Sequence, residues 1–244
     1  MPADFWRIVN EVIDESDIVL EILDARMIKE TRNSEIEEKV KEQHKILIFV
    51  INKCDLADQD ELKKLKLTPS VYVSSTKRYG ITKLLHLILR YVTKKEKVIV
   101  GVMGYPNTGK SSVINALKGR GSAPTAPISG YTKAKQLIKI TDKVYLMDTP
   151  GVYPYMENDN LKHAMTASLD PSKIRDPENA VTELMRKFRG KIEAYYGISA
   201  TKNIEDNLEK IAVKNNRLMK GGIPDTKTMA RMILQTWQKG KIKL

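Results

Sequence analysis

Short apolar runs rich in valine and isoleucine alternate with charged, amphipathic stretches along the chain as far as Val152. Runs of this kind are typical of buried strands, and apolar residues three or four positions apart indicate helices between them. Strands that alternate with helices predict an α/β fold with a mostly parallel sheet covered by helices on both faces. We expect strands at residues 18–23, 46–51, 71–73, 98–103, 137–140 and 144–147, and helices at 33–42, 58–66 and 81–92.

The pattern changes beyond Val152, where no further strand-like run occurs and the remaining periodic segments are helical. This change predicts two domains, an α/β domain at residues 1–155 and a small all-helical domain at 156–244. The helices expected in the second domain span residues 160–168, 178–187, 203–215 and 226–238.

The stretch before the last expected helix, Gly221 to Asp225, has the composition of a turn followed by an N-cap. The apolar face of that helix carries Met229, Ile233 and Trp237 at helical spacing. We expect these three side chains to pack the core of the small domain.

Composition places the chain among ordinary globular proteins, with 41% hydrophobic and 30% charged residues. No apolar run approaches the roughly 18–20 residues that span a bilayer, so we expect no membrane partner. The N-terminus lacks the basic and then apolar pattern of a signal peptide. A single cysteine, Cys54, excludes an internal disulfide and indicates a reducing compartment, and we expect the cytoplasm.

The formal net charge of +12 is large for 244 residues and favours an anionic partner. Much of the excess positive charge lies near the end of the chain, where residues 210–244 include nine Lys and Arg but one acid, Asp225. Charge alone does not separate RNA from DNA or an anionic surface. A solvated tail is the alternative interpretation.

A phosphate-binding loop is predicted at Gly104-Tyr105-Pro106-Asn107-Thr108-Gly109-Lys110-Ser111, which matches the pattern G-x-x-x-x-G-K-[ST]. The loop follows an expected strand and precedes a helical segment, which is the context this motif requires. Its backbone N–H groups then face the phosphates, Lys110 reaches the β- and γ-phosphates, and Ser111 ligates Mg²⁺. We expect nucleotide contacts from Asn107, Thr108, Gly109, Lys110, Ser111 and Ser112.

The γ-phosphate is expected to meet two further segments. Asp148-Thr149-Pro150-Gly151 ends a strand, where the carboxylate can hold Mg²⁺ through water and the Gly151 N–H can meet the phosphate. Thr132 lies in the connection where the first switch of a GTPase belongs, and we assign it to Mg²⁺ and the γ-phosphate. The expected catalytic residues are Lys110, Thr132, Asp148 and Gly151, and the expected metal ligands are Ser111, Thr132 and Asp148.

Guanine is the predicted base. Asn52-Lys53-Cys54-Asp55 follows a strand and matches Asn-Lys-x-Asp, in which the Asp55 carboxylate accepts hydrogen bonds from guanine N1–H and the N2 amine. Adenine cannot satisfy this arrangement, so the discrimination against ATP is roughly 10²–10⁴-fold. Ser75-Thr76-Lys77 follows the next strand and supplies backbone N–H groups for guanine O6. The expected base-binding residues are Asn52, Lys53, Asp55, Ser75, Thr76 and Lys77.

The order of these motifs is unusual, because both guanine-binding segments precede the phosphate loop, whereas in ordinary GTPases they follow it. A compact domain tolerates such a circular permutation when its original ends lie close together. With this order, the sequence resembles the YlqF/YawG-type circularly permuted GTPases, the group of ribosome biogenesis GTPase A. The likeness extends over essentially the whole chain, including residues 17–26, 31–33 and 221–225.

The resemblance implies GTP hydrolysis coupled to assembly of the large ribosomal subunit, with GTP/GDP and Mg²⁺ as ligands and ribosomal RNA as the partner. No obligate protein partner is evident. Val152 stands where many GTPases have a water-orienting glutamine, so we expect slow intrinsic turnover that a partner stimulates. Asn107 stands where potassium-stimulated relatives have asparagine, which implies a K⁺ ion. For Arg26 and Arg32, structural, RNA-binding and trans-acting catalytic roles all remain open.

Two alternatives come from other classes of protein. One is a P-loop GTPase that acts in tRNA or RNA modification, with the helical domain binding the substrate. The other is a nucleotide-dependent binding module unrelated to ribosomes, in which hydrolysis plays no part. The presence of Lys110, Ser111 and Asp148 favours an enzyme over such a module.

Overall fold

The computed structural model describes residues 3–92, 96–119, 137–149, 151–154 and 157–244. The chain divides into two compact units, Met1–Glu157 and Asn158–Leu244. The expected boundary after residue 155 lies close to this division.

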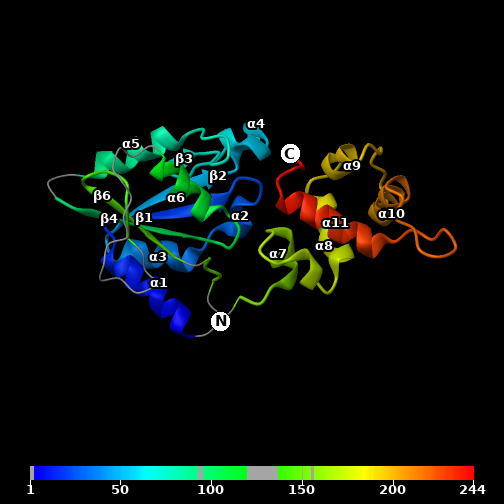
Figure 1. Cartoon of the computed structure of the whole chain (residues 1–244), viewed down its shortest axis with the longest axis horizontal. Helices are drawn as coiled ribbons and strands as arrows, with labels where there is room; N and C mark the ends of the chain where they lie inside the picture. The colour runs from blue at the N-terminus through cyan, green and yellow to red at the C-terminus, as the bar shows by residue number, and fades with distance from the viewer. Residues whose placement is uncertain (1–2, 93–95, 120–136, 150, 155–156) are drawn as a thin grey trace. The chain divides into compact units, whose positions relative to one another are not determined.

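A six-stranded sheet with strand order β3-β2-β1-β4-β6-β5 forms the centre of the first unit. Every neighbouring pair is parallel except β5 and β6, which form an antiparallel hairpin. The mostly parallel sheet predicted from the sequence is therefore confirmed (Figure 1). The strands are β1 (Ile18–Asp24), β2 (Ile46–Asn52), β3 (Ser70–Tyr72), β4 (Val98–Gly104), β5 (Leu137–Lys139) and β6 (Val144–Asp148).

Helices cover both faces of this sheet, because its central strands carry apolar side chains on both sides. All seven residues of β1 are buried. On one face α5 (Ile81–Tyr91) and α6 (Lys110–Lys118) pack against the strands, and on the other face α1 (Ala3–Glu15) and α3 (Ser34–Glu42) do so (Figure 1). Short helical turns complete the unit: α2 (Ile28–Thr31), η1 (Cys54–Leu56) and α4 (Gln59–Lys63).

Helix α1 is an element that the expected helices did not include. Its apolar residues Trp6, Val9, Val12 and Ile13 are buried in one cluster with residues of α3 and of the sheet. Their spacing is helical, so the signal is present in the sequence.

The second unit is helical. Trp237 is fully buried at its centre and its indole N–H donates to the carbonyl oxygen of Met165 at 2.8 Å. Met229 and Ile233 are fully buried as well, as predicted, and the Asp225 side chain caps the last helix by accepting from the N–H of Thr228. The elements are α7 (Asn160–Met165), η2 (Pro171–Lys173), α8 (Pro177–Lys187), α9 (Lys191–Tyr195), α10 (Ile204–Lys214) and α11 (Thr226–Gln238).

Among the described residues, no helix combines the length and the apolar character needed to cross a bilayer.

Candidate nucleotide-binding site

The predicted phosphate loop joins the end of β4 to the start of α6, with two glycines at positions that require them. Gly104 has φ +147°, and a Cβ there would lie 2.4 Å from the carbonyl oxygen of Ile22 on the neighbouring strand. Gly109 has φ +94°, and a Cβ there would lie 2.3 Å from the side-chain nitrogen of Asn52. Any larger residue would therefore push the loop away from the elements beside it.

Lys110 begins α6 and turns its side chain back into the loop. Its Nζ donates to the carbonyl oxygens of Gly104 at 2.9 Å and Tyr105 at 3.0 Å, and the side chain is buried. Burial lowers the pKa of Lys110 to about 8, and the negative charge of Asp148 acts in the opposite direction. A buried cation at a helix N-terminus beside glycine-rich backbone is suited to binding a phosphate group.

Asp148, the last residue of β6, carries a buried carboxylate oxygen, Oδ1, for which the described residues provide no hydrogen-bond partner. Burial raises the pKa of this carboxyl group, and the charge of Lys110 partly opposes the rise. An unsatisfied buried oxygen is costly unless it binds a cation or water, so Asp148 fits a magnesium ligand. No cluster of three or more His, Cys, Asp or Glu side chains suited to a metal occurs among the described residues.

The segment after Asp148 packs closely on the phosphate loop. The hydroxyl of Thr149 donates to the Val102 carbonyl at 2.8 Å, and the N–H of Val152 donates to the Gly104 carbonyl at 3.0 Å. A Cβ on Gly151 would lie 2.8 Å from Cα of Pro106, so only glycine allows this approach. The loop at the end of β6 is thus built against the loop at the end of β4.

Asn52 joins three loops at the carboxyl ends of the strands. Its side-chain Nδ2 donates to the carbonyl oxygen of Thr108 at 2.8 Å, and its Oδ1 accepts from the N–H of Ser75 at 3.2 Å. The side chain is 1% exposed. The structure therefore brings the two predicted guanine-binding segments and the phosphate loop together, although the three lie far apart in sequence.

Lys53 makes a second connection between these segments. Its Nζ lies 2.7 Å from Oδ2 of Asp24, at the end of β1, and 2.7 Å from the carbonyl oxygen of Asn107. Asp24 also accepts two hydrogen bonds from the side chain of Arg26. Burial alone would raise the pKa of Asp24, but the charges of Arg26 and Lys53 hold it well below its usual range.

The remaining candidate guanine-binding residues lie at the edge of the predicted nucleotide site. Asp55 Oδ2 lies 3.3 Å from Nζ of Lys77, whose side chain is largely exposed. The backbone N–H of Lys77 donates to the hydroxyl of Ser74, and this hydroxyl is also 3.4 Å from that of Thr76. The loop is closed by reciprocal backbone hydrogen bonds between Ser74 and Tyr79.

A protein-family model described as RsgA GTPase matches residues 13–156, more than half of the chain. The chain belongs to the RsgA GTPase family. A second model, described as 50S ribosome-binding GTPase, matches residues 99–216. The order of its motifs makes it a circularly permuted member.

Curated relatives of this chain include an uncharacterized GTP-binding protein of Methanocaldococcus jannaschii. It is 38% identical over 97% of this chain and 65% of its own length. Nucleolar GTP-binding protein 2 of Yarrowia lipolytica is 36% identical over 97% of this chain and 49% of its own length. The chain thus spans 49% to 65% of the length of these two relatives.

The fold of this chain is similar to that of YlqF from T. maritima, which has been solved in GDP-bound and GNP-bound forms. The TM-scores are 0.67 and 0.65 at 24% identity, with 96% and 98% of this chain and 94% of each solved chain covered. This likeness shows the fold, which is the predicted circularly permuted P-loop GTPase fold with a helical C-terminal region.

Arg26 and Arg32, whose roles the sequence left open, both form ion pairs within the first unit. Arg26 is 4% exposed and pairs with Asp24. Arg32 donates from Nε and Nη2 to the two carboxylate oxygens of Glu37, and its guanidinium lies over the ring of Phe49. These contacts favour structural roles, and for the buried Arg26 they argue against one in trans.

Some predicted site residues are exposed to solvent, and others lie outside the described residues. Ser111 and Ser112 are exposed in the first turn of α6. Thr132 and Pro150 lie outside the described residues. Tyr105 was not singled out from the sequence, yet it is fully buried, stacks edge-on against Tyr153 with ring centroids 4.9 Å apart and donates to Glu157.

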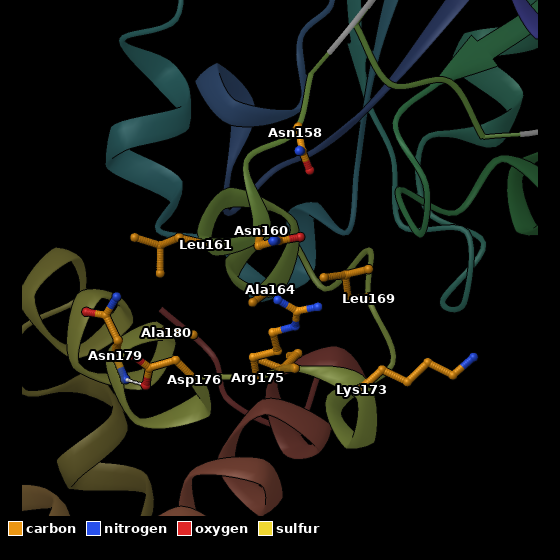
Figure 2. A pocket seen from close by; sticks show the side chains of 11 residues that line it. Asn158, Asn160, Leu161, Ala164, Leu169, Lys173, Arg175, Asp176, Asn179 and Ala180 are labelled. Carbon is orange, nitrogen blue, oxygen red and sulfur yellow. Dashed lines mark hydrogen bonds between the residues drawn. The ribbon is translucent and has the colours of Figure 1, made fainter. Parts of the chain in front are cut away.

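A separate cavity of about 600 Å³ lies in the second unit (Figure 2). Apolar side chains, side-chain amides, two cations and one acid line it, and Figure 2 shows the Arg175 side chain among them. None of the predicted nucleotide-site residues lines it. The lining residues are Asn158, Asn160, Leu161, Ala164, Leu169, Lys173, Ile174, Arg175, Asp176, Asn179 and Ala180.

Proposed function

We propose that this protein binds GTP, hydrolyses it to GDP and phosphate, and acts as a switch in assembly of the large ribosomal subunit through ribosomal RNA. The observation that carries the nucleotide part is the position of Asn52, hydrogen-bonded to the phosphate loop and to the Ser75 loop at once. A base and a triphosphate can then be bound in one pocket, as the motifs require.

In this proposal the base is read by the loops after β2 and β3, and the phosphates by the loop after β4. Asp55 accepts from guanine N1–H and the N2 amine, while backbone N–H groups of the Ser75 loop donate to O6. Lys110 moves from the carbonyls of Gly104 and Tyr105 to the β- and γ-phosphates. Further contacts come from Asn52, Lys53, Thr76, Lys77, Asn107, Thr108, Gly109, Ser111 and Ser112.

Mg²⁺ is the metal that these residues fit. Ser111 in the first turn of α6 and the unsatisfied carboxylate oxygen of Asp148 would hold it, and Thr132 would join them in the GTP-bound state. When bound, the ion neutralises charge on the phosphate oxygens. We propose Lys110, Thr132, Asp148 and Gly151 as the residues that support hydrolysis.

Turnover without a partner is expected to be slow. Val152 is fully buried in the core beneath the site, and its hydrocarbon side chain cannot orient an attacking water. We propose that a ribosomal partner accelerates the reaction and that K⁺ near Asn107 supplies positive charge. Equal rates of GTP hydrolysis in K⁺ and Na⁺ would contradict the proposed role of K⁺.

The proposed role in ribosome assembly is supported by the names of related proteins and by the net charge of this chain. The family model over residues 99–216 is described as 50S ribosome-binding, and relatives are named nucleolar GTP-binding proteins. A net charge of +12 suits an RNA partner. We retain the cytoplasm as the proposed location, on the basis of the single cysteine and its reducing environment.

Two measurements test the proposal. Calorimetry should show GTP and GDP binding in Mg²⁺, with ATP bound roughly 10²–10⁴-fold more weakly. Sedimentation with ribosomal particles should place the protein on large-subunit precursors with a non-hydrolysable GTP analogue and release it with GDP. Equal affinity for ATP would overturn the nucleotide assignment, and free protein in every nucleotide state would overturn the ribosomal one.

A further inference from the structure

The connection between α10 and α11 forms a small β-hairpin, which we call the tip hairpin and define as residues 217–225. The N–H of Met219 donates to the Ile223 carbonyl at 2.8 Å, and Leu218 and Pro224 form an antiparallel bridge. Gly221 and Gly222, with φ +83° and +77°, make the turn. In Figure 1 this segment extends beyond the ends of both helices.

Large apolar side chains are exposed on the tip hairpin. Leu218, Met219 and Ile223 are 47%, 52% and 57% exposed, and Val213 at the end of α10 is 50% exposed. Elsewhere in the described chain, side chains of this size and exposure occur singly. Apolar side chains gathered on one protruding element mark an interaction surface rather than ordinary surface variation.

Both ends of the hairpin are held firmly. The N–H of Arg217 donates to the Ala212 carbonyl at 2.9 Å, which joins the hairpin to the end of α10. The N–H of Asp225 donates to the Arg217 carbonyl at 2.8 Å, and the Asp225 side chain caps α11. The apolar side chains are thus presented on an ordered backbone, so a partner has little backbone entropy to overcome on binding.

Positive charge surrounds the apolar tip. Within the part of the chain that the structure describes, Lys220 in the turn forms no ion pair, and Arg217 and Lys227 flank the hairpin as exposed cations. The nearest acid, Asp225, is engaged as the cap of α11. The acidic residues of α10 lie in its first and middle turns, at Glu205, Asp206 and Glu209.

We propose that the tip hairpin is an RNA-binding wedge, in which Met219 and Ile223 pack against unstacked bases and the surrounding cations contact phosphates. The proposal rests on the RNA-binding role proposed above and assigns it to one element. Met, Ile and Leu side chains are the type that inserts at base steps, and Lys and Arg beside them supply the sequence-independent attraction.

RNA fits this surface better than a protein or a membrane. The cations lie beside the apolar tip rather than on one face of a long amphipathic helix, which is the form that membrane-surface binding takes. The nine cations against one acid from residue 210 to 244 favour a polyanion over a protein surface of mixed charge. Unpaired bases in a bulge or loop offer both an apolar face and neighbouring phosphates.

The test uses the full chain with its GTP analogue and an RNA stem-loop whose bulge carries 2-aminopurine, which becomes brighter when unstacked. The wedge variant Met219→Gln with Ile223→Thr keeps every charge. Lys220→Gln keeps the apolar tip. Leu89→Gln, which changes an exposed leucine of α5, is the matched control, and all variants should show unchanged melting temperatures.

The wedge variant should bind this RNA about tenfold more weakly, with the fluorescence increase lost and the dependence of log K on log salt unchanged. Lys220→Gln should keep the fluorescence increase and reduce the salt slope by about 1. Equal affinity and equal fluorescence in the wild type and the wedge variant would overturn the inference alone. Absence of RNA binding by the wild type would overturn the proposed RNA role as well.

Discussion

The side-chain nitrogen of Asn52 donates a hydrogen bond to the carbonyl oxygen of Thr108, 56 residues further along the chain, at 2.8 Å. This bond joins the loop that is expected to read guanine to the loop that is expected to bind phosphate. The other side-chain atom, Oδ1, accepts from Ser75, so a single buried amide sets the spacing of three loops. The order of the segments along the chain does not affect this geometry, which explains how a permuted chain retains one pocket.

Replacing Asn52 should therefore weaken nucleotide binding without removing any atom proposed to touch the nucleotide's phosphates. Asn52→Ala removes the partner of the buried Thr108 carbonyl and of the partly buried Ser75 N–H, at a cost of about 1–3 kcal/mol. We expect the Kd for GDP to rise by about 10- to 100-fold in titration calorimetry. Asn115→Ala, an exposed change on α6, is the control, and equal Kd values for both variants would contradict the assignment.

Asp55→Asn should change the preferred base. The carboxylate offers two acceptors to guanine, whereas an amide offers one acceptor and one donor. That pattern suits xanthine, which has a carbonyl where guanine has its N2 amine. We expect GTP affinity to fall by about 100-fold and xanthosine triphosphate affinity to rise, measured in parallel titrations. If the variant kept its preference for GTP, Asp55 would not be the residue that reads the base.

Much of the fold follows from the sequence because its signals are local. All six strands occur where valine and isoleucine runs predicted them, and the cap at Asp225 and the buried face of α11 follow from turn and helix patterns. Helix α1 was not among the expected helices, although its apolar residues have helical spacing. No predicted strand precedes it to mark where a helix should begin.

The parts of the candidate site that belong to known sequence motifs could be predicted from the sequence. The motifs predicted the segments that contain Asn52, Gly104 and Asp148. They did not connect Asp24 to Lys53, because an ion pair between residues 29 positions apart produces no periodic pattern in the sequence. The tyrosine contact between the phosphate loop and the segment after Gly151 was missed for the same reason. Long-range polar pairs depend on the packed fold and have no sequence pattern of their own.

The Asp24 carboxylate should be essential to the first unit. Asp24→Asn leaves Arg26 and Lys53 without their buried counter-charge, and breaking such a pair costs about 3–5 kcal/mol. Because the pKa of Asp24 is lowered in the folded state, its contribution is present above the unfolded value near pH 4 and is lost as the pH falls further. Urea unfolding should show the destabilisation.

The background for this measurement is Trp237→Phe, in which the remaining tryptophan, Trp6, reports on the first unit. Asp60→Asn is the matched control, since Asp60 pairs with Lys63 at the surface, and such pairs contribute about 0–1 kcal/mol. Similar unfolding midpoints for Asp24→Asn and Asp60→Asn would show that the buried pair is not important for stability.

Nucleotide affinity should depend on pH through Lys110. Burial lowers the pKa of this lysine to about 8 in the nucleotide-free protein, whereas phosphate binding requires the protonated form. We expect the affinity for GDP to be constant below pH 8 and to fall above it, by up to about tenfold per pH unit. Lys110→Arg remains charged and shares any titration of guanine, so the difference between the two proteins isolates the lysine. Parallel profiles would contradict this expectation.

Glu21 should make the first unit less stable as the pH rises. This carboxyl group is fully buried in β1 and accepts from the N–H of Asn33 at 2.7 Å. Burial, followed by the nearby charge of Glu37, raises its pKa from 4.5 to about 8. A raised folded-state pKa means that its contribution is fully present below pH 4.5 and is lost as the pH approaches 8.

Glu21→Gln keeps the shape and the acceptor oxygen but cannot ionise. Its unfolding free energy should therefore exceed that of the wild type by about 1 kcal/mol or more above pH 8, and the difference should shrink as the pH falls toward 5. Urea unfolding in the Trp237→Phe background gives the measurement, and Glu38→Gln, an exposed change on α3, is the control. A difference that stays constant from pH 5 to 9 would mean that Glu21 is already ionised in the folded protein, with Arg32 as its counter-charge.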